Sequence, residues 1–220
     1  MKRCGSTWEP AAATGIDRDG EPSLSWVLQL ILCRLPQLIL IATTAPLAWL
    51  MMQVVHECGH ALFGWLTGGE VRQVVLHPLT ISRTDLGANP HPLVVCWAGP
   101  VLGSIAPVLL WLVARATKWS GEFWLRFFAG YCLIANGSYL AIGSFDRIGD
   151  AGDLLKHGSP IWMLWLFGAI TISVGLRLWH GLGQSFGLGP QATPLRWPAA
   201  LIVAGALIVT VTVEALLSGR

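Results

Sequence analysis

Charged residues are scarce in this chain. Of its 220 residues, 12% are Asp, Glu, Lys or Arg, whereas 54% are hydrophobic, and the mean hydropathy is +0.60. A water-soluble domain carries about 25% charged residues, because these side chains keep its surface hydrated. The composition therefore excludes a water-soluble globular protein and predicts an integral membrane protein.

A dense positive patch and a cysteine framework are missing as well. The 14 Lys and Arg residues are nearly balanced by 12 Asp and Glu residues, and the net charge of +2 excludes a surface that could hold nucleic-acid phosphates. The five cysteines are odd in number and form no C-x-x-C pair. The sequence thus predicts no nucleic-acid partner, no disulfide framework and no thiolate zinc site.

Long apolar runs fill most of the chain. Residues 1–23 place charges among Gly and Pro and predict a polar N-terminal tail, whereas residues 24–220 predict a single helical membrane domain. A helix that crosses a bilayer needs roughly 20 apolar residues. We therefore expect an all-α polytopic fold with about five transmembrane helices, at 36–66, 92–114, 123–143, 160–182 and 197–217.

The first of these runs is unusual at both of its ends. Arg34 and Pro36 interrupt the apolar residues that begin at Leu24, so we expect an interfacial lead-in and a span that starts at Pro36. A helix of that length, about 46 Å, must tilt, kink near Pro46 or begin outside the hydrocarbon core of about 30 Å. After it, residues 71–76 and 79–83 have strand character and predict a small β-hairpin.

The segment His56-Glu57-Cys58-Gly59-His60 is an H-E-x-x-H motif inside the first apolar helix. Residues four apart lie on one helix face, so both imidazoles could bind one tetrahedral Zn²⁺ while Glu57 stands beside the reacting water. Unpaired polar groups are costly in hydrocarbon, which argues against three without a role. The alternative is a hydrogen-bonded polar cluster within a helix bundle.

On these residues the chain resembles the site-2 protease family of intramembrane zinc metallopeptidases. The resemblance covers about residues 50–156 and continues with Ala98-Gly99-Pro100, Asn136 and the stretch Asp150-Ala151-Gly152-Asp153-Leu154-Leu155. It implies a metallopeptidase core at about 36–156, with additional helices at 160–217. It also implies that Asp150 is the third zinc ligand and that Asn136 binds the substrate near the scissile peptide.

Both of these implied roles have alternatives. Position 139 is Tyr where the family usually has proline, and Asp146 is a second candidate for the third ligand. Asp150 could instead cap a short helix, and Asn136 could make a hydrogen bond between two helices. His157 is a minor alternative ligand.

The sequence and the resemblance together predict an intramembrane zinc endopeptidase. One Zn²⁺ would be held by His56, His60 and Asp150, with Glu57 as the catalytic base. The expected partners are a transmembrane or membrane-anchored protein substrate and the lipid bilayer, in a multi-pass protein of the plasma membrane. The alternatives are a structural or transport metal site, or a non-catalytic relative that binds membrane clients.

Overall fold

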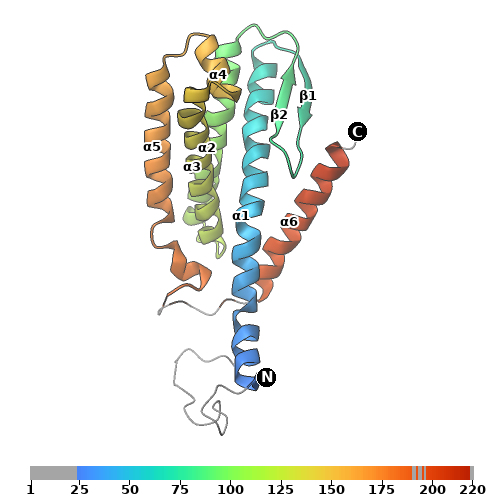
Figure 1. Ribbon diagram of the computed structural model, residues 1–220, viewed down its shortest axis with the longest axis vertical. Coiled ribbons are helices and arrows are strands. Elements are labelled where there is room, and N and C mark those ends of the chain that lie inside the picture. Colours follow the sequence, from blue (N-terminus) through green and yellow to red (C-terminus); the bar gives the residue numbers. More distant parts are fainter. Residues whose placement is uncertain (1–23, 190–191, 193–194, 196, 219–220) are drawn as a thin grey trace. The chain divides into compact units, whose positions relative to one another are not determined.

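The structure is a computed structural model that describes residues 24–189, 192, 195 and 197–218. The predicted polar tail at 1–23 lies outside the described residues. Six α-helices, a 3-10 helix and two strands follow in chain order (Figure 1): α1 Leu24–Leu66, β1 Val71–Val75, β2 Arg83–Leu86, α2 Pro92–Ala116, α3 Glu122–Asp146, α4 Gly149–Lys156, α5 Ile161–Trp179, η1 Leu182–Phe186 and α6 Trp197–Ser218.

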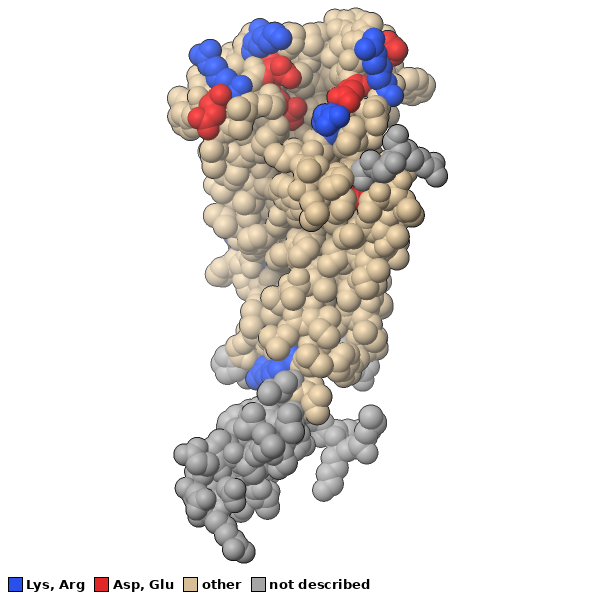
Figure 2. Space-filling model, turned by 45° about the vertical axis from the view of Figure 1, so that its right-hand side comes forward, with Lys and Arg blue, Asp and Glu red and all other residues tan. Residues whose placement is uncertain are grey.

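Five of the helices are long and apolar enough to cross a membrane. They are α1 from Leu32, α2, α3, α5 and α6 up to Leu217. The prediction of an all-α polytopic fold with five spans and a hairpin after the first is confirmed. On the face seen in Figure 2, most of the charged side chains gather at the upper end, and a broad surface with few of them extends below.

The described residues form two compact units. The larger unit runs from Leu47 to Leu182 and includes α6 from Val209, while the smaller unit contains α1 up to Pro46 and the segment Gly183–Ile208. All residues singled out by the sequence as candidate site residues belong to the larger unit.

The helix α1 starts earlier than the sequence predicted. It is continuous from Leu24, with Pro36 and Pro46 inside it, so the expected break at Pro36 is wrong. Proline removes one backbone hydrogen bond, but apolar membrane helices tolerate it because the helix remains the only way to satisfy the other backbone groups. Hydroxyl groups also bond back to the helix here, as Thr43 and Thr44 do with the carbonyls of Ile39 and Leu40.

The predicted hairpin is present, but its second strand is displaced. Strand β1 pairs with β2 in antiparallel register, with Val75 opposite Arg83 and Val74 opposite Thr84. The segment predicted as the second strand, 79–83, is therefore mostly connecting loop, and its side chains Leu79 and Ile81 are exposed. The error arises because β2 is polar and carries no apolar alternation, whereas the loop does.

Small residues bring the helices of the larger unit close together. The backbone carbonyl oxygens of Gly137 and Gly130 lie against Gly168 and Gly175, where α3 packs on α5. At the α1–α2 crossing, a Cβ atom on Gly59 would lie 2.5 Å from the carbonyl oxygen of Ala98. Such approaches are typical of membrane helix interfaces and place the polar faces of α1, α2 and α3 within hydrogen-bonding distance.

Candidate metal centre

The two motif histidines and Asp150 converge on one point. The Nε2 atoms of His56 and His60 are 3.0 Å apart, and Oδ2 of Asp150 lies 2.8 Å from the first and 3.2 Å from the second. Both imidazoles are buried, and among the described residues these three form a group able to hold a metal ion. The histidines come from adjacent turns of α1, and the carboxylate comes from the first turn of α4.

The opposite ring nitrogens are fixed by protein oxygens. His60 Nδ1 lies 2.8 Å from the carbonyl oxygen of Val95, which can only accept, so this nitrogen carries the proton. His56 Nδ1 donates in the same way to Oδ1 of Asn136 at 2.7 Å. The Asn136 amide is oriented by its own donation to the Cys132 carbonyl. In the neutral imidazoles, each Nε2 therefore keeps a lone pair for a ligand.

These three donor atoms fit a zinc ion. Zinc–nitrogen bonds of about 2.0–2.1 Å in a tetrahedron place ligand atoms roughly 3.3 Å apart, close to the separations seen here. Two lone pairs and a carboxylate oxygen so close together repel one another unless a cation or a proton lies among them. The donor set, two imidazoles and one carboxylate, is also one that zinc takes in hydrolytic sites.

Asp150 has the charge state that a ligand needs. Burial by itself would raise the pKa of its carboxyl, but when the imidazoles of His56 and His60 also carry a proton on Nε2, their hydrogen bonds and charges outweigh burial and hold the pKa of the carboxyl well below its usual range. Its backbone N–H donates to the Tyr139 hydroxyl at 3.1 Å, which fixes the start of α4 against α3. Asp150 is thus ionised at neutral pH and held in place.

The structure does not place Asp150 in the helix-capping role that was its alternative. Ile148 is the N-cap of α4, no side chain caps that helix, and the Asp150 carboxylate turns to the histidines instead. The second candidate ligand, Asp146, is an exposed residue at the end of α3 and does not belong to the cluster. His157 is the C-cap of α4 and does not belong to it either.

Asn136 makes the interhelical hydrogen bond that was its alternative role. It is 1% exposed, and both ends of its amide are engaged, with His56 and with Cys132. A Cβ on Gly103 would lie 2.9 Å from the amide nitrogen, so glycine leaves room for it. Contact between Asn136 and a substrate stays a prediction.

Glu57 lies on the same helix but outside the three-residue cluster. Its Oε1 accepts from the Ser82 hydroxyl at 2.8 Å, and its Oε2 accepts from the Thr84 hydroxyl at 2.6 Å. Sequence reasoning missed Ser82 and Thr84, as well as Tyr139 beside Asp150. A signal was available, because a carboxylate buried in an apolar helix needs donors and the adjacent hairpin supplies hydroxyl side chains.

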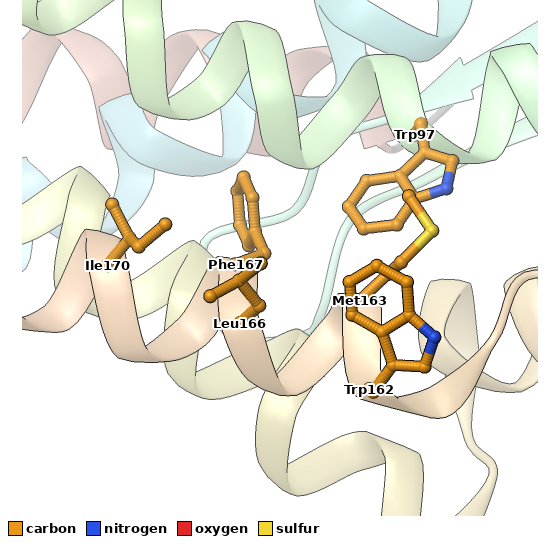
Figure 3. Close-up of a pocket in the computed structure, with 6 residues that line it drawn as sticks. All are labelled: Trp97, Trp162, Met163, Leu166, Phe167 and Ile170. Carbon is orange, nitrogen blue, oxygen red and sulfur yellow. The ribbon is translucent and has the colours of Figure 1, made fainter.

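An apolar groove lies elsewhere on the larger unit. It is formed by α2 and α5 and contains none of the polar residues of the candidate metal centre (Figure 3). Its lining residues are Trp97, Trp162, Met163, Leu166, Phe167 and Ile170. Apolar side chains that face outward on membrane-spanning helices are expected to meet lipid. We assign the chemistry to the polar cluster and not to this groove.

Comparison with protein-family models matches residues 24–136 to the family described as Peptidase M50B-like. The match covers just over half of the chain. The chain belongs to this family. The match includes His56, Glu57, His60 and Asn136 and ends before Asp150. Neither the curated proteins nor the solved structures contain a significant match.

Family membership confirms the resemblance to the membrane core of site-2 proteases. The family is one of zinc-dependent peptidases, and together with five apolar helices it identifies an integral, multi-pass membrane protein of the peptidase type.

Proposed function

We propose that the protein is an intramembrane zinc endopeptidase that hydrolyses peptide bonds of membrane-embedded protein substrates. One observation carries the proposal: two imidazole nitrogens and a carboxylate oxygen, all within 3.2 Å, meet beside a glutamate on an apolar helix. Family membership supports the same reaction class.

The residues divide into ligands and a base. His56, His60 and Asp150 would hold the ion, which when bound polarises a carbonyl and makes a water molecule more acidic. Glu57 takes a proton from the attacking water and passes it to the leaving amine. Asn136 and the Val95 carbonyl keep the two imidazoles in the tautomer that binds metal.

The substrate class follows from the surroundings of the site. A transmembrane helix hides its peptide bonds in internal hydrogen bonds, so cleavage requires local unwinding. Strands β1 and β2 form a two-stranded sheet, and an edge of it would bind the unwound segment by β-addition. We expect transmembrane or membrane-anchored substrates in the plasma membrane.

Glu57→Gln separates proteolysis from the other possible roles. We expect this variant to retain zinc but to lose cleavage of single-span substrates, because glutamine cannot accept the proton. His56→Ala and His60→Ala should lose both zinc and cleavage. Zinc is measured by elemental analysis of the purified protein and cleavage by gel assay in proteoliposomes.

Glu70→Gln is the matched control, since Glu70 is an exposed carboxylate just before β1 that forms an ion pair with Arg72. It should leave both readouts unchanged. Full cleavage by Glu57→Gln would refute the protease and favour a structural or transport metal site. Substoichiometric zinc in the wild type would favour a non-catalytic relative that binds membrane clients.

A further inference from the structure

The carboxylate of Glu57 is held by two hydroxyl groups, one on each oxygen. Ser82 donates to Oε1 at 2.8 Å and Thr84 donates to Oε2 at 2.6 Å. Glu57 and Ser82 are both buried, at 4% and 8% exposure. Because each oxygen has its own donor, the carboxylate plane cannot rotate without breaking a charge-assisted hydrogen bond.

The donors are themselves fixed in place. The backbone N–H of Ser82 donates to Oε1 of Gln53 at 2.7 Å, and Gln53 lies one helical turn before Glu57 on the same face of α1. Thr84 belongs to β2 and is paired with Val74 of β1. Three side-chain contacts therefore tie the start of β2 to the face of α1 that carries the glutamate.

This arrangement leaves the carboxylate able to accept a proton. A carboxylate has about four acceptor positions, and the two hydroxyls occupy one on each oxygen. A general base works best when its free acceptor position has a fixed direction toward the proton that it removes. The hydroxyls restrict the direction and leave an acceptor position open.

We infer that Ser82 and Thr84 are positioning residues for the catalytic base, so that the hairpin is part of the catalytic apparatus and not only a place for substrate to dock. The inference rests on the proposed function, in which Glu57 is the base. It goes beyond that proposal because it assigns a role to two hairpin side chains that are neither metal ligands nor residues of the helix motif, and that act through their hydrogen bonds to Glu57.

The test compares hydroxyl-deleting substitutions with one that keeps the hydroxyl. Thr84→Val and Ser82→Ala should each lower kcat for a single-span substrate about tenfold or more, because each removes a hydrogen bond to a charged group. KM and zinc content should stay at wild-type values. Thr84→Ser keeps the hydroxyl and should retain most of the activity.

Thr80→Ala is the matched control. Thr80 is an exposed residue of the same loop, and its hydroxyl makes no hydrogen bond within the described part of the chain. Its activity should equal that of the wild type. Because Thr84→Val alters a strand, Ser82→Ala provides an independent measurement outside the strand, and normal zinc content reports that each variant is folded.

Three results would overturn the inference: wild-type or faster cleavage by both Thr84→Val and Ser82→Ala, a loss by Thr84→Ser equal to that of Thr84→Val, or a change confined to KM. Glu57→Gln is measured in the same assay. If Glu57→Gln is inactive while the hydroxyl variants are fully active, only this inference fails. If Glu57→Gln is active, the proposed function fails instead.

Discussion

Each candidate ligand residue in this protein makes a further hydrogen bond to a second protein group. A carbonyl oxygen fixes His60, an amide fixes His56, and the Tyr139 hydroxyl receives the backbone N–H of Asp150. Groups of this kind set the tautomer and direction of a metal ligand before the ion arrives. At the scale of single residues, the site is therefore preorganised by side chains and backbone atoms from α1, α2, α3 and α4.

Asp150 is the residue on which the ligand set can be tested. Asp150→Ala should weaken zinc binding about a hundredfold or more, because it leaves two nitrogens where three donors met. Zinc affinity is measured by competition with a chromophoric chelator in detergent. Asp146→Ala is the control, since Asp146 is exposed and should have no effect. Release of zinc by Asp146→Ala alone would show that the ligand assignment is displaced by four residues.

The sequence was most informative where the chemistry is local. His56, Glu57 and His60 lie within five residues, and helical spacing alone predicts that the two histidines share a face. Asp150 is 90 residues from His60 and could be suggested only through a family resemblance. Ser82 and Thr84 were missed because their relation to Glu57 depends on how a loop returns to a helix, which no short-range pattern contains.

At the scale of elements, the crossing of α1 and α2 determines whether His60 fits. A Cβ atom on Gly99 would lie 2.3 Å from Nε2 of His60, well inside any normal contact distance. Gly99→Ala should therefore displace the imidazole and lower bound zinc at least tenfold without unfolding the helices. Zinc content and far-UV circular dichroism together check this prediction.

Gly205→Ala is the control for that substitution, because a Cβ there would meet nothing within 4 Å. It should keep wild-type zinc. Normal zinc in Gly99→Ala would mean that His60 has another rotamer available and that this crossing does not constrain the site.

Element boundaries were predictable where hydropathy changes sharply and unpredictable where it does not. The spans α2, α3, α5 and α6 lie within a few residues of the apolar runs. The predicted start of α1 and the predicted position of β2 were wrong. The helix continues through a proline that it tolerates, and β2 is polar and lacks the apolar pattern of a strand. In both cases tertiary surroundings overrode a local preference.

At the scale of the whole molecule, the candidate metal centre joins distant parts of the chain. It draws its atoms from α1 and α4, which are connected only through the hairpin, α2 and α3. An ion that binds only the folded protein stabilises it by mass action, about 4 kcal/mol when its concentration is 1,000 times the Kd. Removal of zinc should therefore lower the melting temperature by several degrees.

This prediction is checked by thermal unfolding in detergent with and without a chelator. Wild type should lose stability on chelation, and added zinc should restore it. His60→Ala should melt at one temperature under all three conditions. An equal chelator effect on wild type and His60→Ala would place the stabilising metal somewhere other than this cluster.

The hairpin returns along α1 as far as Gln53, which is 13 residues, or about 20 Å of helix, from the end of α1 at Leu66. Loop backbone beside a membrane-spanning helix needs partners for its amides, because bare amides in hydrocarbon cost several kcal/mol each, and Gln53 supplies one for Ser82. Before Gln53 along α1, Ala48 and Met52 pack with Phe128 and Cys132 of α3 in an apolar layer. Under the proposed function, the water that hydrolysis consumes would therefore reach Glu57 from the side of the hairpin and not through this layer.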